Sequence, residues 1–275
     1  MLDQMLKDKV AIITGSGRGI GKAAAIMLAK SGAKVVISDI DPEPAQEVVT
    51  EIQNAGGEAI SYIGDVTGDD FANNIINCAA QKWGAIHIII NNAGFTWDSM
   101  IHKMTDKQWD TIIDLHLKAP FKIIRAAKPW FCDAAKKEIE NTGKAVARKI
   151  INISSISGTT GNAGQANYSA AKSGMIGLTK TISKEWGRYN VQCNAIAFGA
   201  IDTRLSAPKE EGASMSKDGE VISLGIPKQI RDIATMMIPL GRLGTPQEAA
   251  GPILFLASHL SDYVSGEVIT VSGGL

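Results

Sequence analysis

Short apolar runs recur along the chain, and most of them are apolar at every position rather than at alternate ones. They are rich in β-branched residues and are separated by segments of helical periodicity, so each run is expected to form a strand. Strands without a polar face are typical of a parallel sheet covered by helices on both sides. The pattern therefore predicts an α/β fold with a doubly wound parallel sheet, whose strands lie at 10–14, 34–38, 58–64, 86–91, 149–154, 191–197 and 267–272.

Two segments look like additions to this alternation of strand and helix. Residues 133–148 are charged and should extend a helix into a solvated loop, whereas residues 205–235 are long enough for a lid. Within the second segment, Asp218-Gly219 predicts a hairpin turn and Pro227 the start of a helix. The chain has no Pro/Ser-rich linker and no internal repeat, so residues 1–275 are interpreted as a single domain.

The composition narrows the class of protein further. The 275 residues are 45% hydrophobic and 20% charged, which suits one large α/β domain. Lysine plus arginine and aspartate plus glutamate number 28 each, so neither nucleic acid nor an acidic membrane surface is expected as a partner. The three cysteines are widely separated and indicate neither a disulfide framework nor a metal site. With no apparent leader or membrane-spanning run, a cytoplasmic protein without a bound metal is expected.

The first strand is followed by the glycine-rich stretch TGSGRGIG, residues 14–21, and then by a helix. Glycines in such a turn let the backbone approach a pyrophosphate, which the free N–H groups and dipole of the helix stabilise. The next strand ends at Asp39, whose carboxylate can accept hydrogen bonds from the adenosine ribose of NAD and would repel the extra phosphate of NADP. Arg18 inside the turn could pair with that phosphate, so NAD is favoured and NADP is the less favoured alternative.

A second group of residues indicates chemistry at the carboxyl end of the strand at 149–154. Ser155 follows this strand, and Tyr168 and Lys172 are four residues apart, which places both on one face of a helix. A neighbouring ammonium favours a phenolate, so Lys172 should lower the pKa of Tyr168. Tyr168 could then exchange a proton with a substrate oxygen that Ser155 holds by a hydrogen bond. This arrangement suits interconversion of an alcohol and a ketone with a nicotinamide cofactor.

Together these motifs closely resemble the classical short-chain dehydrogenase/reductase family, over nearly the whole chain. TGSGRGIG is similar to its glycine motif, GDV at residues 64–66 to its adenine-contacting motif, and NNAG at residues 91–94 to its fourth-strand motif. The resemblance implies a Rossmann-type fold, a homotetramer, and catalysis by Ser155, Tyr168, Lys172 and His116. It further implies that a nicotinamide cofactor contacts Gly15, Ser16, Gly17, Arg18, Gly19, Ile20, Gly21, Asp39, Ile40, Asp65, Val66, Asn92, Ala93, Gly94, Tyr168, Lys172, Gly199, Ile201 and Thr203.

Two positions depart from the family pattern. His116 stands where the family has an asparagine, and Phe198 replaces a proline before Gly199. The family asparagine holds a catalytic water through its main-chain carbonyl at a helix irregularity. Here Pro120 has no N–H to occupy the His116 carbonyl in a regular helix, so the same device is expected. The alternatives are a simple helix kink at Pro120, or an imidazole that itself moves protons. Phe198 is interpreted as a packing residue, with a reshaped cofactor wall as the alternative.

The function expected from these residues is oxidation or reduction of a small-molecule secondary alcohol or ketone. Within the family, GQANYSAAKSGMIGLTK is most similar to 3-oxoacyl-thioester reductases and 3-hydroxyacyl-CoA dehydrogenases. The apolar residues of the 205–235 segment favour an apolar substrate, unless they only pack that segment onto the domain. Two other functions stay open: a catalytically silent subunit of a mixed oligomer, and a nucleotide-binding regulator without turnover.

Overall fold

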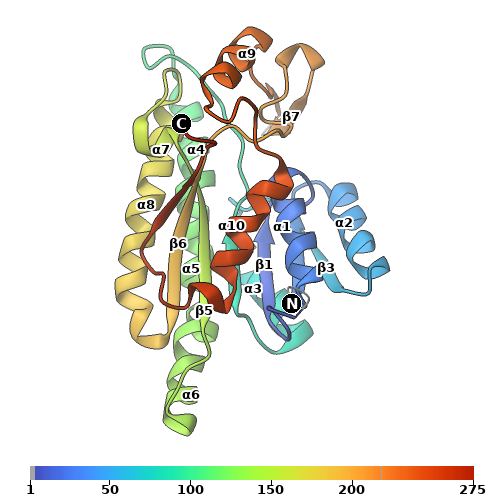
Figure 1. Ribbon diagram of the computed structural model, residues 1–275, viewed down its shortest axis with the longest axis vertical. Coiled ribbons are helices and arrows are strands. Elements are labelled where there is room, and N and C mark those ends of the chain that lie inside the picture. The colour runs from blue at the N-terminus through green and yellow to red at the C-terminus, as the bar shows by residue number, and fades with distance from the viewer. Residues whose placement is uncertain (1–3, 218) are drawn as a thin grey trace.

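The computed structural model describes residues 4–217 and 219–275, and its centre is a parallel sheet of seven strands (Figure 1). The strands occur in the order β3-β2-β1-β4-β5-β6-β9. This is the doubly wound sheet that the apolar runs predict, with every strand end within two residues of its expected position. The strands are β1 (Val10–Thr14), β2 (Lys34–Asp39), β3 (Glu58–Ile63), β4 (Ile88–Asn91), β5 (Arg148–Ser155), β6 (Val191–Phe198) and β9 (Val268–Val271).

Helices cover both faces of this sheet. The α-helices are α1 (Gly19–Lys30), α2 (Pro42–Asn54), α3 (Phe71–Trp83), α4 (Asp106–Ile113), α5 (Ala119–Ala126), α6 (Ala134–Thr142), α7 (Ser157–Thr160), α8 (Ala166–Trp186), α9 (Lys228–Met237) and α10 (Pro246–Ala257). Two π-helical turns, η1 (Asp114–Lys118) and η2 (Pro129–Asp133), and three short 3₁₀ turns, η3 (Gly187–Tyr189), η4 (Lys209–Glu211) and η5 (His259–Ser261), complete the elements.

Alternate residues of each strand supply two separate cores. Ile13 of β1 points into the layer beneath α1, α2 and α10, whereas its neighbour Ile12 packs with α3, α5 and α8. Both side chains are fully buried, as are Ile89 and Ile90 of β4 in the same alternation. Because a strand side chain alternates between faces, burial on both faces requires apolar residues at successive positions. This explains the continuous apolar runs of the sequence.

The charged segment 133–148 is only partly solvated. As expected, α6 extends from the body of the molecule and is followed by a loop (Figure 1). The last residue of the segment, Arg148, is however buried at the start of β5, where two of its nitrogens donate to the Glu138 carboxylate at 3.0 and 2.6 Å. This pairing compensates the desolvation of the guanidinium.

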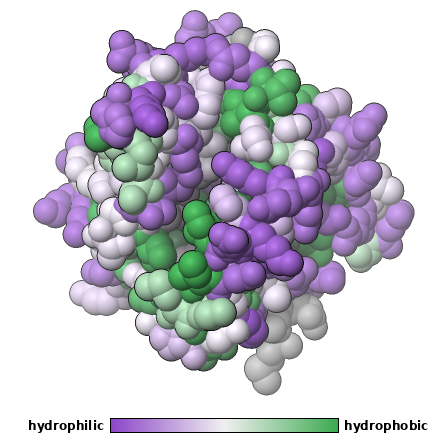
Figure 2. All heavy atoms as spheres, turned by 90° about the horizontal axis from the view of Figure 1, so that it is seen from above, coloured by the Kyte–Doolittle hydropathy of each residue, from purple (hydrophilic) through white to green (hydrophobic). Residues whose placement is uncertain are grey.

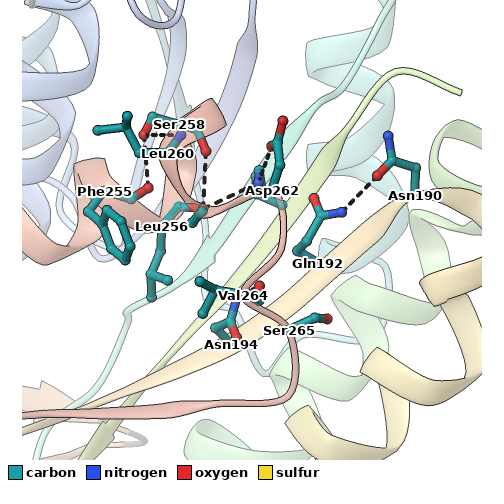
Figure 3. Close-up of polar contacts among 12 residues, drawn as sticks. Asn190, Gln192, Asn194, Phe255, Leu256, Ser258, Leu260, Asp262, Val264 and Ser265 are labelled. Atoms are coloured by element: carbon teal, nitrogen blue, oxygen red, sulfur yellow. Dashed lines mark hydrogen bonds and ion pairs between the residues drawn. The ribbon is translucent and has the colours of Figure 1, made fainter.

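Polar side chains form hydrogen bonds between β6, η5 and the chain that follows η5 (Figure 3). Asn194 of β6 donates to the Val264 carbonyl at 2.8 Å, and Ser258 caps the turn η5 by accepting from the Leu260 N–H at 3.3 Å. Nearby, the buried ammonium of Lys149 is 2.7 Å from Asp262. These contacts secure α10 and the chain leading into β9.

The 205–235 segment forms a separate hairpin and helix above the carboxyl end of the sheet (Figure 1). Strands β7 (Ser214–Lys217) and β8 (Glu220–Ser223) pair antiparallel, as a hairpin requires. Of the expected turn, Gly219 has the φ of +79° that favours glycine, while Asp218 lies outside the described residues. Helix α9 begins directly after Pro227, as expected.

The apolar residues of this segment serve two different purposes. Ile222 and Leu224 are buried and pack into the core beneath α3 and α5, so they anchor the segment, whereas Ile230 and Met236 of α9 are exposed. Packing onto the domain therefore explains some of these residues but not all of them.

Candidate active site

A cavity of about 330 Å³ opens at the carboxyl ends of the central strands, between the glycine turn and the hairpin β7–β8. Figure 2 views this end of the molecule, where apolar residues gather beside a hollow among mostly hydrophilic ones. The carboxyl ends of parallel strands, at the point where strand order reverses, are where ligands bind in this architecture. The sequence motifs converge here: all the expected site residues line the cavity except Ser16 and Gly17.

The glycine turn exposes the amino end of α1 to this cavity. Gly19, Ile20 and Gly21 line it, and within residues 4–217 and 219–275 no side chain caps the first N–H groups of the helix. A Cβ at Gly21 would lie only 2.2 Å from the Gly15 carbonyl oxygen, so the turn needs glycine to close. Unsatisfied N–H groups at a helix amino end fit a phosphate. The turn therefore fits the pyrophosphate of a dinucleotide.

Residues 91–94 hold this turn in place. The Asn92 side chain donates to the carbonyls of Thr14 and Gly15, both at 2.9 Å, and the Thr14 hydroxyl accepts the N–H groups of Asn92 and Ala93, both at 3.0 Å. Gly94 faces His116, whose Cε1 a Cβ at this position would approach to 2.1 Å. The motif thus joins the end of β4 to the turn that follows β1.

Two of the expected cofactor contacts have internal roles in the structure. Ser16 is fully buried, and its hydroxyl donates to the Ile13 carbonyl at 2.8 Å, while the Gly17 N–H donates to Asp39 at 2.9 Å. Within the described chain neither residue lines the cavity. Closing the turn already uses these groups, and a contact of Ser16 or Gly17 with the cofactor stays a prediction.

The carboxylate of Asp39, at the end of β2, lies beside the ion pair of Arg18 and Asp41. Asp39 accepts the N–H groups of Gly17 and Asp41, at 2.9 and 3.2 Å, and lines the cavity. Arg18 pairs with Asp41 at 2.5 Å, and the guanidinium of Arg204 adjoins the same group of charges. Burial and the Arg18 charge lower the pKa of Arg204. The adenosine end of the cavity thus has a fixed negative group with cations beside it.

Ser155, Tyr168 and Lys172 meet at the carboxyl end of β5. Ser155 ends that strand, and Tyr168 and Lys172 lie one turn apart on α8, which packs against β5 and β6. The Ser155 side chain lies beside the Tyr168 phenol, and the Lys172 ammonium lies 5.5 Å from the centre of the Tyr168 ring. Lys172 donates to the Ile153 carbonyl at 2.6 Å. The spacing in the sequence thus correctly brings these three residues together.

The pKa of Tyr168 is raised in this structure and not lowered as the sequence predicts. Burial raises the pKa of Tyr168 to about 12, against the opposing effect of the Ser155 hydrogen bond. Burial also lowers the pKa of Lys172 to about 7. The lysine donates to a main-chain carbonyl rather than to the phenol, so desolvation dominates both groups.

His116 lies in the π-helical turn η1, where the sequence expects an irregularity. The Ala119 N–H donates to Asp114, five residues back, and Pro120 offers no N–H to the His116 carbonyl. The imidazole is buried, and its Nε2 is 2.7 Å from the Phe95 carbonyl oxygen. A carbonyl only accepts, so Nε2 carries the hydrogen.

The His116 ring is neutral in this environment. Burial, followed by the Lys172 charge, lowers the pKa of His116 well below its ordinary value. Its Nδ1 finds no hydrogen-bond partner among the described residues, so a second ring proton would be buried without an acceptor. The alternative in which this imidazole gains and loses protons near neutrality is not supported by this geometry.

Two further residues that line the cavity were missed in the sequence. Lys217, at the end of β7, forms an ion pair with Asp65 and donates to Thr67 at 3.2 Å, which holds the hairpin against the end of β3. Arg204 lies beside the Arg18–Asp41 pair. The sequence around Lys217 does not indicate a contact with residues some 150 positions away.

Phe198, the second of the two departures from the family pattern, is the last residue of β6. Its side chain is buried in the core, as expected of a packing residue, and it also borders the cavity. Packing and a contribution to the cavity wall are therefore both features of this position.

In the part of the chain that the structure describes, no group of histidine, cysteine and acidic residues could hold a metal ion. None of the described helices is both long and apolar enough to cross a bilayer.

Comparison with known proteins agrees with the geometry. Residues 15–275 match the family model described as enoyl-(acyl carrier protein) reductase. The 3-oxoacyl-[acyl-carrier-protein] reductase FabG of Thermotoga maritima is 37% identical over 270 residues, covering 98% of each chain. The 3-oxoacyl-[acyl-carrier-protein] reductase of Synechocystis is 37% identical over 272 residues, again 98% of each. The (3R)-3-hydroxyacyl-CoA dehydrogenase of Rattus norvegicus is 34% identical over 278 residues, covering 98% of this chain and 97% of the relative.

These matches confirm the resemblance found in the sequence motifs. They extend over nearly the whole chain and include the glycine turn and the segment with Ser155, Tyr168 and Lys172. The chain belongs to the short-chain dehydrogenase/reductase family, whose members use a nicotinamide cofactor.

Proposed function

We propose that the chain is an NAD-dependent oxidoreductase that interconverts 3-oxoacyl and 3-hydroxyacyl thioesters. The observation that carries this proposal is the meeting of Ser155, Tyr168 and Lys172 beside a cavity that fits a dinucleotide. The relatives above are named for reactions on 3-oxoacyl and 3-hydroxyacyl groups, which supports the substrate class.

The catalytic roles follow from the geometry of the three residues. A bound nicotinamide supplies the hydride for reduction and accepts it in oxidation. With its raised pKa, Tyr168 holds its proton at neutral pH and can give it to the substrate oxygen during reduction. In the reverse direction the phenolate takes the hydroxyl proton. Ser155, which lies beside the same phenol, donates a hydrogen bond to the substrate oxygen while the charge of that oxygen changes.

Lys172 and His116 support this proton transfer. The Lys172 ammonium is held beside the Tyr168 ring by the Ile153 carbonyl, where it is placed to stabilise the phenolate and to bind the nicotinamide ribose. The His116 carbonyl, left without a donor four residues on, is available to a water that leads from Lys172 to solvent. His116 acts in this proposal through its main chain.

NAD is the preferred cofactor in this proposal. The Asp39 carboxylate is fixed by two N–H groups at the adenosine end, where it can accept from ribose hydroxyls and repels a phosphate. Of the two cations beside Asp39, Arg18 is already paired with Asp41, whereas Arg204 lines the cavity. Thr203, Ile201 and Gly199 also line the cavity and are assigned to the nicotinamide.

The substrate side of the cavity is apolar. Phe95, Leu115, Phe198, Leu205 and Met215 border the cavity along with the catalytic groups. Such a wall suits an acyl chain better than a sugar, because sugar hydroxyls would lose water without gaining partners.

We further propose that the protein works in the cytoplasm as a homotetramer acting on a small molecule. Strand β9 is at the edge of the sheet, and Tyr263, fully exposed, lies shortly before it. Leu260 and the terminal Leu275 are also largely exposed, which suits a contact between copies.

The test is turnover by the purified chain with 3-oxoacyl thioesters and NADH or NADPH, followed by NADH absorbance. We expect reduction of thioesters with NADH, and little activity on polyols. A polyol preferred over every thioester would contradict the substrate class. Binding of NADH without turnover of any alcohol, ketone or thioester would favour a silent subunit instead.

A further inference from the structure

Two loops meet at the rim of the active site, close to Ser155. One is the chain after β4, and the other is the loop that leads into α8. They are joined by the Ser99 N–H, which donates to the Gly164 carbonyl at 2.8 Å, and by a parallel bridge between Ser99 and Gln165. The side chains of Asp98 and Gln165 therefore face each other from fixed backbones.

A chain of hydrogen bonds begins at this junction. Gln165 Nε2 donates to Asp98 Oδ2 at 2.9 Å, and Gln165 Oε1 accepts from Ser157 Oγ at 3.0 Å and from Asn162 Nδ2 at 3.1 Å. A carboxylate can only accept, so Asp98 fixes which end of the Gln165 amide faces it. The amide oxygen must then face Ser157.

Ser157 connects the Gln165 amide to Ser155. Its side chain is buried at the start of α7, and its main-chain N–H donates to Ser155 Oγ at 3.1 Å. This bond fills an acceptor position of the Ser155 hydroxyl, whose own hydrogen stays available to donate. A serine that must donate to a substrate oxygen needs this arrangement.

Asp98 has few other contacts that could explain its position. The groups near it are the Thr96 side chain, the Lys209 ammonium and the Tyr168 phenol, which keeps its proton at neutral pH. Among the described residues, hydrogen bonds connect Asp98 to Ser155 through Gln165 and Ser157.

We propose that Asp98 and Gln165 are positioning residues that, through Ser157, orient the Ser155 hydroxyl as a donor to the substrate oxygen. This inference rests on the proposed function, because it assigns a task to Ser155 in that reaction. It adds two residues, 67 positions apart in sequence, to the groups on which turnover depends.

The test uses three variants whose effects differ in direction. In Asp98→Asn the new amide can donate to Gln165 and reverse it, which removes the acceptor of Ser157; we expect kcat to fall about tenfold with KM within about twofold. In Gln165→Glu two carboxylates meet, and a shared proton can hold them together only at low pH. Relative to wild type, the activity of Gln165→Glu should therefore fall as pH rises.

The double variant Asp98→Asn/Gln165→Glu provides the rescue. The amide introduced at position 98 donates to one oxygen of the carboxylate introduced at position 165, and the other oxygen again accepts from Ser157 and Asn162. We therefore expect kcat to return to within about threefold of wild type without the added pH dependence. Asp232→Asn, an exposed change on α9, is the matched control. Single variants with wild-type kcat, or a double variant no better than the singles, would overturn the proposal.

A second measurement does not depend on turnover. Deuterium uptake of residues 156–161 should rise in Asp98→Asn and return to the wild-type level in the double variant. A wild-type protein that turns over no thioester would refute the proposed function, whereas uptake unchanged in Asp98→Asn would refute the positioning chain by itself.

Discussion

The imidazole of His116 stands edge-on against the phenol of Tyr168, with ring centres 5.0 Å apart and planes at 89°. The contact is possible because the neighbouring residue Gly94 has no side chain, and because the Phe95 carbonyl holds Nε2. His116 therefore packs against Tyr168 from one side, while its main chain belongs to the π-helical turn. Side chain and carbonyl can be tested separately.

His116→Asn and Pro120→Ala together distinguish these two roles. If the carbonyl matters, His116→Asn should keep kcat within about threefold, whereas Pro120→Ala restores an N–H that can occupy the His116 carbonyl and should lower kcat roughly tenfold. Steady-state rates across pH, with folding checked by circular dichroism, give the answer. A folded Pro120→Ala protein with an undiminished rate would reject the carbonyl, and a large loss confined to His116→Asn would indicate the imidazole.

Replacing Asp39 should change the choice of cofactor. Asp39→Asn keeps an oxygen for the Gly17 N–H but removes the charge that repels a phosphate, so affinity for NADP relative to NAD should rise on the order of tenfold. Asp39→Ala should also raise the affinity for NADP relative to NAD. Both cofactors should bind more weakly to this variant, because the Gly17 N–H loses its hydrogen-bond acceptor. Fluorescence titration of NADH and NADPH measures both effects. Tighter binding of NADPH than NADH by the wild type would show that Asp39 is wrongly assigned.

The hairpin β7–β8 should loosen when Lys217 is replaced. Lys217→Gln removes the ion pair with Asp65 and leaves the Lys107–Glu220 pair, at 2.5 Å, as an ionic anchor of this hairpin. A partly exposed pair contributes about 1 kcal/mol, so local opening and cofactor release should quicken about fivefold. Deuterium uptake of residues 213–224 and stopped-flow release of NADH report on this. Lys144→Gln, on an exposed loop, is the control, and equal uptake in both variants would contradict the role of Lys217.

The buried Lys172 should make stability depend on pH when no cofactor is added. Its pKa is about 7 in the fold, against an ordinary value of 10.5, so between these values the unfolded chain binds more protons and stability rises with pH. Lys172→Met removes this dependence. From pH 7 to pH 9 the free energy of unfolding of wild type should rise by roughly 2 kcal/mol relative to that of Lys172→Met.

Urea unfolding at fixed protein concentration measures the effect of Lys172. Lys144→Met serves as the exposed control and should leave the pH dependence of wild type unchanged. A constant difference between wild type and Lys172→Met over this range would mean that Lys172 is not desolvated as the structure indicates.

The strands were predictable because burial on both faces leaves a signal at every position, as at Ile12 and Ile13. The meeting of Ser155, Tyr168 and Lys172 was predictable because Tyr168 and Lys172 are one helical turn apart and Ser155 ends a recognisable strand. These are local relationships between sequence and geometry.

Relationships across long stretches of chain could not be read in the same way. The 205–235 segment brings Lys217 to Asp65, and the packing of the two rim loops brings Gln165 to Asp98. The raised pKa of Tyr168 also escaped prediction, since it depends on how completely the fold excludes water, which the spacing to Lys172 does not reveal.

Single-turnover reduction of a 3-oxoacyl thioester by enzyme with bound NADH, compared between wild type and Tyr168→Phe, tests the central claim most directly. The Phe variant lacks only the hydroxyl that gives the proton, so it should bind NADH normally and reduce the thioester about 10²–10⁴-fold more slowly. Oxidation of NADH by Tyr168→Phe at the wild-type rate would contradict the assignment of Tyr168, and with it the proposed chemistry of the site.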